Sequence, residues 1–149
     1  METLIYIAIF SILMSGAVVG SYNLLEGGSR NMTATGIQEE GTFLNRKINW
    51  ALTGATATVA SPSGTTLTIT RPDLGSQSPL VIIGNGTSMT ITRGASTPIV
   101  LNSDRFPVAG PSSGHMFSIQ PAAAGRPSSA TVSFQILGKP FLFRTYMRQ

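Results

Sequence analysis

Residues 4–20 form an almost unbroken apolar run near the start of the chain. Only Ser11 and Ser15 interrupt it, and a serine hydroxyl inside a helix can donate to a carbonyl of the preceding turn. About 20 apolar residues are enough for a helix to cross the hydrocarbon core of a membrane. With its continuation to Leu25, the run predicts a helix over residues 1–25 that lies in lipid or among other apolar helices.

Three positions add detail to this predicted helix. Gly16 and Gly20 stand four residues apart, a spacing that permits close approach between two helices. Tyr22 follows the apolar run, where an aromatic ring is expected at the membrane interface. A secretory signal peptide is the alternative, but the run is longer than the apolar core of most signal peptides and no basic residue precedes it. We therefore expect an uncleaved anchor.

The apolar positions then change to the spacing of an amphipathic helix. They lie seven, four and four residues apart, at Ile37, Leu44, Ile48 and Leu52. Phe43 is expected to widen this stripe. Gly27–Gly28 is expected to kink or melt the helix, because glycine has a low helix propensity. Residues 26–53 are thus predicted to continue the first helix in water, up to a capping glycine at Gly54.

Beyond the helix, threonine, valine and isoleucine alternate with other residues at a period of two, which is typical of half-buried strands. The predicted strands are residues 65–71, 79–84, 88–94, 130–137 and 140–147. Asn85–Gly86 and Gly138–Lys139 are expected to form hairpin turns. Because strands follow a helix and do not alternate with helices, the predicted class is α+β. We expect a long helix packed on one antiparallel sheet formed by residues 54–149.

Composition and charge narrow the possible functions. The chain has 149 residues, enough for one ordinary domain, and a net charge of +4. Its basic residues are spread from Arg30 to Arg148 without a dense cluster, whereas nucleic-acid binding needs a concentrated basic face. No nucleic-acid partner is therefore predicted. The chain contains no cysteine, which excludes disulfides and thiolate metal sites.

Groups that carry catalytic chemistry are few. His115 is the single histidine, so a zinc site would have to depend mainly on carboxylates. Asp73 and Asp104 are the only acids after residue 54, and their turn-like surroundings favour a turn-forming role over an acid/base pair. No G-x-S-x-G motif occurs. We expect no enzymatic activity, no cofactor, and no catalytic, cofactor-binding or metal-binding residues.

The segment "ETLIYIAIFSILMSG" resembles the N-terminal helix of type IV pilins and of the pseudopilins of type II secretion systems. In that family a prepilin peptidase removes a short basic leader and methylates the new amino terminus. The mature chain begins with a few apolar residues and a glutamate, followed by a long apolar helix and a C-terminal antiparallel sheet. The segments "MTITRG", "TPIVLNS" and "ATVSFQIL" look more like minor pseudopilins than like a major pilin, which often has a cysteine-closed loop near its end.

The resemblance places Glu2 at the position of the family's glutamate. That glutamate is the fifth residue after cleavage in the family but the second residue here, so we expect the natural chain to extend upstream of Met1. A carboxylate in lipid is costly unless it is paired. The terminal ammonium of a neighbouring subunit would be the partner, and this pair would fix the axial register of the two helices. A simpler role is also open, because the helix macrodipole favours an acid in the first turn.

The resemblance implies a minor pilin or pseudopilin, a structural subunit of a type IV pilus or type II secretion-like filament. Its partners would be other subunits, the prepilin peptidase and, before assembly, membrane lipid. It would cross the bacterial inner membrane once, with the C-terminal domain outside the cytoplasm, and then enter an extracytoplasmic filament. Loops at Pro72–Pro79 and Gly110–Pro127 would meet partners. The alternative is a single-pass anchored β domain that binds a ligand or partner without polymerising.

Overall fold

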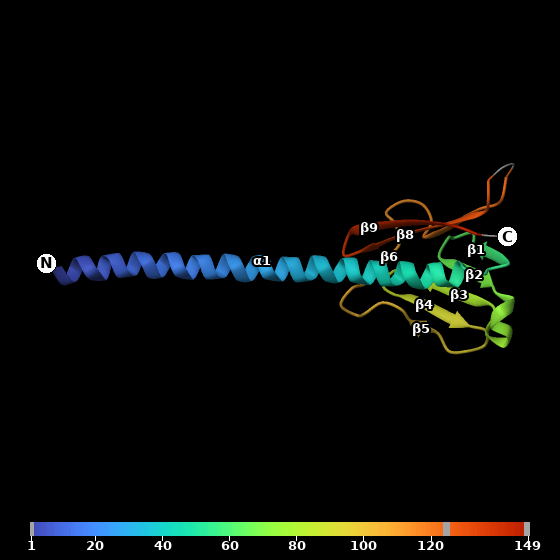
Figure 1. The fold of residues 1–149 in the computed structure, drawn as a ribbon, viewed down its shortest axis with the longest axis horizontal. Coiled ribbons are helices and arrows are strands. Elements are labelled where there is room, and N and C mark those ends of the chain that lie inside the picture. Colours follow the sequence, from blue (N-terminus) through green and yellow to red (C-terminus); the bar gives the residue numbers. More distant parts are fainter. Residues whose placement is uncertain (1, 124–125, 148–149) are drawn as a thin grey trace. The chain divides into compact units, whose positions relative to one another are not determined.

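The computed structural model of the chain describes residues 2–123 and 126–147, and it has the predicted α+β architecture. One long helix, α1 (Glu2–Leu52), is followed by a region of antiparallel strands (Figure 1). The chain divides into two compact units, residues 1–36 and residues 37–149. The described part of the first unit is helix alone, and the second unit contains the end of α1 and all the described strands.

Helix α1 is unbroken at Gly27–Gly28, so the predicted melted turn is wrong. Two glycines lower helix stability by about 2 kcal/mol relative to alanine. Ending the helix and nucleating a new one would cost more, about 4 kcal/mol for a nucleation constant near 10⁻³. Glu26 and Arg30 also form an exposed ion pair across the glycines, with Oε1 and Nη2 2.5 Å apart. Continuing the helix is therefore the less costly arrangement.

The end of α1 is formed as predicted. Gly54 has a φ of 81°, a conformation that glycine adopts without a Cβ clash. The amide of Thr53 donates to the carbonyl of Asn49 at 2.9 Å, and that of Ala55 donates to the carbonyl of Leu52 at 3.1 Å. The chain then turns directly into the first strand.

The first sheet is a five-stranded antiparallel meander, in which each strand pairs with the next along the chain. Its strands are β1 (Ala57–Ala60), β2 (Thr66–Thr70), β3 (Leu80–Gly84), β4 (Met89–Arg93) and β5 (Ile99–Val100). A 3-10 helix, η1 (Pro72–Gln77), connects β2 to β3, where we expected only a loop. The predicted alternation holds, because the side chains of β2 and β4 that were expected on the apolar face are buried.

The turn between β3 and β4 lies one residue beyond the predicted Asn85–Gly86 pair. The amide of Asn85 donates to the carbonyl of Ser88 at 3.0 Å, which leaves Gly86 and Thr87 as the central residues. Gly86 has a φ of 92°. The carboxamide oxygen of Asn85 accepts from the Ser88 amide at 2.8 Å, so the Asn85 side chain adds a second hydrogen bond across the turn.

The second sheet is built around one long strand, β8 (Ser129–Ile136), as Figure 1 shows. It pairs antiparallel with β9 (Lys139–Tyr146) along its whole length, and also with β7 (Phe117–Gln120) and β6 (Val108–Ala109). The β8–β9 connection consists of Leu137 and Gly138, whose φ angles are 48° and 77°. The predicted turn at Gly138–Lys139 is therefore one residue too late.

The prediction of a single sheet is wrong, because the strands form two sheets. Two backbone bonds join the sheets: Phe117 donates to the carbonyl of Gly64 at 2.8 Å, and Val108 donates to that of Thr87 at 3.0 Å. Alternation tells which face of a strand is buried but not which strand is its neighbour. The sequence pattern therefore identified β2, β3, β4, β8 and β9, missed the shorter strands β1, β5, β6 and β7, and did not show how the strands divide into sheets.

One apolar core lies between the two sheets and the end of α1. The helix contributes the predicted stripe of Ile37, Leu44, Ile48 and Leu52, joined by Ala51. Phe43 does not belong to it, because its side chain is 40% exposed. The sheets contribute residues that alternate along each strand, at Leu67, Ile69, Leu80, Ile82, Met89, Ile91, Val108, Phe117, Ala130, Val132, Phe134 and Ile136.

Candidate functional site

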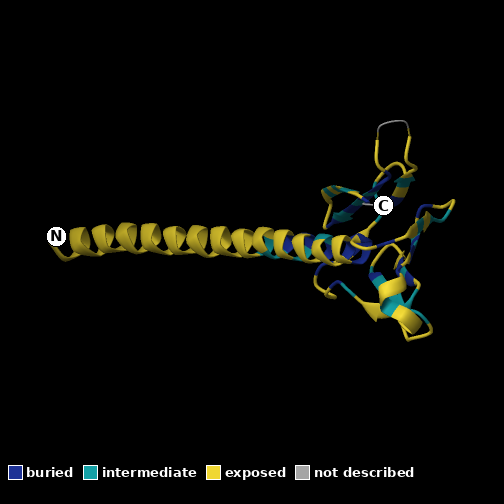
Figure 2. Cartoon of the chain, turned by 45° about the vertical axis from the view of Figure 1, so that its right-hand side comes forward, coloured by how far each residue is buried: buried dark blue, intermediate teal, exposed yellow. Residues whose placement is uncertain are grey.

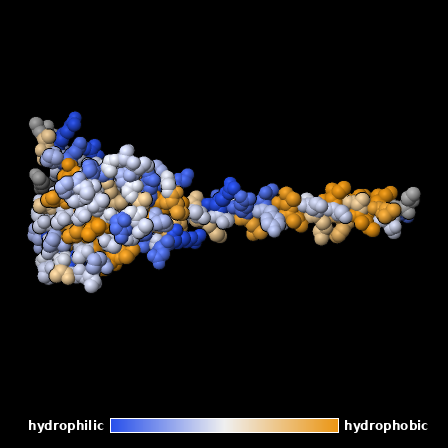
Figure 3. All heavy atoms as spheres, turned by 180° about the vertical axis from the view of Figure 1, so that it is seen from behind, coloured by the Kyte–Doolittle hydropathy of each residue, from blue (hydrophilic) through white to orange (hydrophobic). Residues whose placement is uncertain are grey.

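The described helix of the first unit presents apolar side chains to its surroundings on every side. From Leu4 to Leu25 its large apolar residues are between 51% exposed (Ile9) and 80% exposed (Leu24). Figure 2 shows this segment as exposed, and Figure 3 shows the apolar side chains along it. An apolar surface of this size on a water-exposed helix is unfavourable and must be covered. Its length and composition are those of a membrane anchor or of a signal sequence.

The few polar groups in this segment are satisfied by the helix itself. The hydroxyl of Ser11 donates to the carbonyl of Ile7 at 2.8 Å, and that of Ser15 donates to the carbonyl of Ser11 at 2.6 Å. Ser21 makes the same contact with Ala17 at 2.9 Å. An unpaired hydroxyl in hydrocarbon would cost several kcal/mol, on the order of 4–8 by transfer to cyclohexane. These serines therefore leave the helix suitable for an apolar environment.

The predicted assembly residues all lie on this exposed helix. Glu2 is the acid of the first turn of α1, where the macrodipole favours a negative charge. A methyl group added at Gly16 or Gly20 would meet nothing within 4 Å beyond the adjoining backbone of α1, so a second helix can approach both. Tyr22 is 72% exposed. The prediction for Met1 falls outside the described residues.

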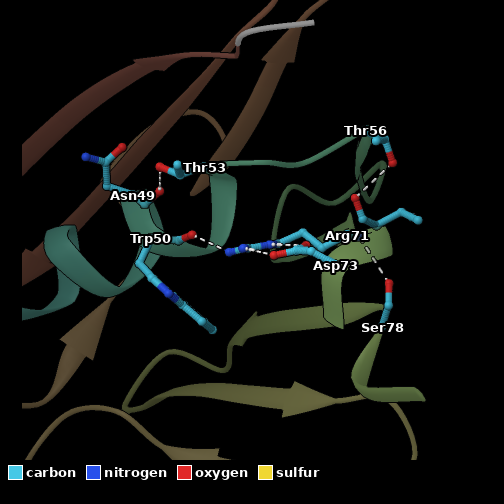
Figure 4. Close-up of polar contacts among 8 residues, drawn as sticks. Asn49, Trp50, Thr53, Thr56, Arg71, Asp73 and Ser78 are labelled. Atoms are coloured by element: carbon cyan, nitrogen blue, oxygen red, sulfur yellow. Dashed lines mark hydrogen bonds and ion pairs between the residues drawn. The ribbon is translucent and has the colours of Figure 1, made fainter. Parts of the chain in front are cut away.

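An arginine that follows a strand of the first sheet caps the C-terminal end of α1, which has no basic residue in its own last turn. Arg71 follows β2, and its Nη1 donates to the carbonyl of Trp50 at 2.7 Å (Figure 4). Its Nε donates to Asp73 Oδ1 at 3.0 Å, and its Nη2 to Asp73 Oδ2. The hydrogen bonds and charge of Asp73 raise the pKa of Arg71, and the same bonds lower the pKa of Asp73. A positive charge is thus fixed at the negative end of the helix.

A basic and aromatic cavity of about 450 Å³ lies beside this arginine. Four of its lining residues come from α1 and share one face at a spacing of three, one and three: Phe43, Arg46, Lys47 and Trp50. The fifth is Arg93, at the end of β4. The sequence interpretation missed this site, although the helical spacing is visible in the sequence. The sequence interpretation had placed Phe43 on the buried stripe and had assigned no role to Arg46 and Lys47.

A second cavity, of about 710 Å³, lies on the second sheet and is lined by Gln120, Pro121, Ala123, Arg126, Pro127, Ser129, Arg144 and Tyr146. Arg144 Nε donates to Ser129 Oγ at 3.2 Å, and its Nη2 donates to Gln120 Oε1. The stretch Gly110–Pro127, which was predicted to be a loop, contains strand β7, and its residues Met116 and Phe117 are buried. Residues 124–125 of that stretch lie outside the described residues.

The residues weighed for catalysis are dispersed. His115 is exposed in the loop before β7, where it packs over Gly64. Asp104 lies in an exposed turn, and Asp73 is engaged by Arg71. Within residues 2–123 and 126–147, no group of three or more His, Cys, Asp or Glu side chains is placed to hold a metal ion.

When the chain is compared with family models, curated proteins and solved structures, none of them matches.

Proposed function

We propose that the chain is a structural subunit of a membrane-derived filament, a minor pilin or pseudopilin of the type IV pilus or type II secretion kind. The observation that carries this proposal is the exposed apolar helix of residues 4–25, which precedes a compact β unit. A helix that is apolar on every side is stable in lipid or inside a bundle of like helices. The resemblance of "ETLIYIAIFSILMSG" to pilin helices favours a subunit that uses both environments in turn.

The helix surface suits transfer from lipid to a filament core. The hydroxyls of Ser11 and Ser15 already donate to carbonyls of the same helix four residues earlier, so exchanging lipid for neighbouring helices breaks no hydrogen bond. Gly16 and Gly20 provide a shallow strip where another helix can pack closely. Packing without directional contacts would let helices slide, so a further device must fix their register.

In this proposal, Glu2 fixes the axial register of the helices. Its carboxylate would pair with the terminal ammonium of an adjacent subunit, because an unpaired charge inside a filament core costs several kcal/mol. Only one axial offset between helices brings the two charges together, and this sets the register. In the membrane, before assembly, Glu2 would stay at the headgroup level.

The same proposal assigns the location and the partners. The helix would cross the bacterial inner membrane once and the β unit would lie outside the cytoplasm, until an assembly machine extracts the subunit into an extracytoplasmic filament. A prepilin peptidase would process the chain. No catalytic or cofactor role is proposed.

An anchored β domain that binds a partner without polymerising is the second candidate. The observation that favours it is the pair of cavities in the β unit, one of them lined by three cations and two aromatic rings. In this case the helix serves only as an anchor, and Glu2 has no partner subunit.

Substituting Glu2 separates the two candidates. In the source cell, Glu2→Ala and Glu2→Gln are expected to remain in the membrane fraction but to disappear from the sheared filament fraction. The matched control is Glu26→Gln, which removes a charge farther along the same exposed helix and is expected to leave assembly unchanged. Absence of the wild-type chain from the sheared filament fraction would overturn the filament proposal and leave the anchored domain. Wild-type filament levels in both Glu2 variants would overturn the register role of Glu2.

A further inference from the structure

The cavity beside Trp50 is strongly basic. It is lined by Arg46, Lys47 and Arg93, and no carboxylate is among its lining residues. Asp73, which belongs to the neighbouring Arg71 site, is already held by two hydrogen bonds from Arg71. The three cations are therefore not neutralised by the residues that line the cavity.

Two aromatic rings contact two of these three cations, Lys47 and Arg93. The Nζ of Lys47 lies 5.5 Å from the centre of the Phe43 ring, and the guanidinium of Arg93 lies 5.4 Å from the centre of the Trp50 ring. Arg71 lies over the same indole at 5.1 Å. Contacts of this kind are modestly favourable at exposed sites. They restrict the motion of Lys47 and Arg93, so less side-chain entropy is lost when a ligand binds.

One hydrogen-bond donor of Arg93 is unpaired within the described residues. Its Nε is buried, and within the described residues it has no hydrogen-bond acceptor. A buried donor left unsatisfied is unfavourable, so the Arg93 guanidinium has hydrogen-bonding capacity that the fold itself does not use. An anionic oxygen is the acceptor that suits a guanidinium best.

We propose that this cavity binds the carboxylate side chains of an acidic segment on a different protein. The carboxylates would accept hydrogen bonds from Arg93 and Arg46, and the flanking Phe43 and Trp50 rings would cover the apolar part of the segment. This inference goes beyond the filament proposal, because it concerns the β unit alone and applies equally to an anchored domain.

The charge of the β unit argues against a second copy of the chain as the occupant. Residues 37–149 contain nine Lys or Arg and four Asp or Glu, a net charge of +5, so two copies repel each other. Two of the four carboxylates are also engaged: Asp73 by Arg71, and Glu40 by the amide of Ser103 at 2.6 Å. A partner with a surplus of acids meets neither obstacle.

The experiment uses the single tryptophan of the chain, which lies in the cavity wall. The full chain in non-ionic detergent is titrated with a blocked, fluorescein-labelled peptide that alternates glutamate with serine. The control peptide has glutamine in place of glutamate. Binding is followed by Trp50 fluorescence and, independently, by the anisotropy of the label. We expect saturable binding of the acidic peptide only, weakened by added salt.

Matched variants test the site. Arg93→Gln is expected to weaken binding about tenfold or more, because it removes a charge-assisted hydrogen bond worth about 1.5–3 kcal/mol. Arg46→Gln, on the exposed helix face, is expected to act in the same direction without affecting the core. Lys139→Gln changes the net charge equally but lies outside the cavity, and it is expected to change affinity less than about twofold.

Four results would overturn the proposal. Equal binding of the glutamine peptide would show that the cavity does not recognise the charge of the peptide. A loss of affinity in Lys139→Gln as large as that in Arg93→Gln would show attraction by net charge alone. Full competition by inorganic phosphate at matched ionic strength would indicate a small-anion site. Arg46-dependent self-association in sedimentation, without peptide binding, would identify a second copy as the occupant. None of these results depends on whether Glu2 variants still form filaments.

Discussion

The ring of Phe141 lies directly against Gly41, so close that a Cβ on residue 41 would clash with its Cε1 atom. Gly41 is buried on α1, and Phe141 belongs to β9. The ring cannot move away freely, because it stacks on Phe134 with the ring centres 5.4 Å apart and also contacts Phe143 at 6.2 Å. The missing side chain at Gly41 thus sets how closely the end of α1 approaches the second sheet.

Gly41→Ala is expected to destabilise the β unit even though alanine favours helix. The gain in helix propensity is about 1 kcal/mol. Forcing a methyl group into a packed core costs about 1–3 kcal/mol, so the net change is a loss of up to about 2 kcal/mol. Urea denaturation followed by Trp50 fluorescence measures it.

The control for this prediction is Phe141→Leu in the Gly41→Ala background. The smaller side chain makes room for the methyl group, so the double variant is expected to be more stable than the sum of the two single changes predicts. Additive losses would mean that the two residues do not limit each other.

Asp73→Asn is expected to destabilise the fold at neutral pH, because Arg71 loses its charged partner at the end of α1. The pKa of Asp73 is lowered in the folded chain, so its contribution to stability is present above the unfolded-state pKa of about 4 and is lost as the pH falls through the folded-state value. The stabilities of wild type and variant should therefore converge in acid. Denaturation midpoints measured from pH 7 down to pH 2 test this.

Glu39→Gln is the matched control for the acid experiment, since Glu39 is an exposed acid on α1. It removes one acid without removing the partner of Arg71, so the acid-dependent loss of stability that comes from the Arg71–Asp73 pair should remain in this variant. If Asp73→Asn showed the same constant offset from wild type at every pH, the ion pair with Arg71 would not be the source of its stability.

Leu137→Asn is expected to stabilise the β8–β9 hairpin. Leu137 has a φ of 48° and its side chain is 52% exposed, so it has backbone strain and little packing. A left-handed conformation costs a residue with a Cβ about 1–2 kcal/mol, and asparagine followed by glycine is the preferred pair for such a turn. We expect a gain of about 1 kcal/mol in the free energy of unfolding, measured by thermal denaturation.

Leu142→Asn serves as the comparison, because Leu142 is also exposed but lies within β9. Asparagine is unfavourable in a strand, so this change should not stabilise the protein. A similar gain in both variants would show that removing any exposed leucine is beneficial and that the turn is not strained.

The sequence was sufficient to predict the elements that depend on local periodicity. The spacing of Ile37, Leu44, Ile48 and Leu52 identified the buried face of the helix, and alternation in the strands identified Leu67, Ile69, Met89 and Ile91 as core residues. Gly54 was correctly placed at the helix end. These features follow from the geometry of a single element, and they need no knowledge of its neighbours.

Features that depend on contacts distant in sequence were not predictable. Asn102 reads as a loop residue, yet it is buried and its Oδ1 accepts from the Met89 amide at 2.8 Å. The pairing of Arg71 with the carbonyl of Trp50, and the approach of Arg93 to the same tryptophan, join the helix to the first sheet. No single-element pattern shows which strand end will lie beside which helical turn.

The strand order of the first sheet, which repeats the order along the chain, affects how a nascent molecule matures. A polypeptide that emerges N-terminus first, from a ribosome or a membrane pore, delivers each strand from β2 to β5 after its partner is already outside. By contrast, β6 and β7 stay unpaired until β8 follows them, and that one arrival completes both ladders. Synthesis of residues 129–136 thus gives β6 and β7 their partner, and the other edge of β8 stays open until β9 follows.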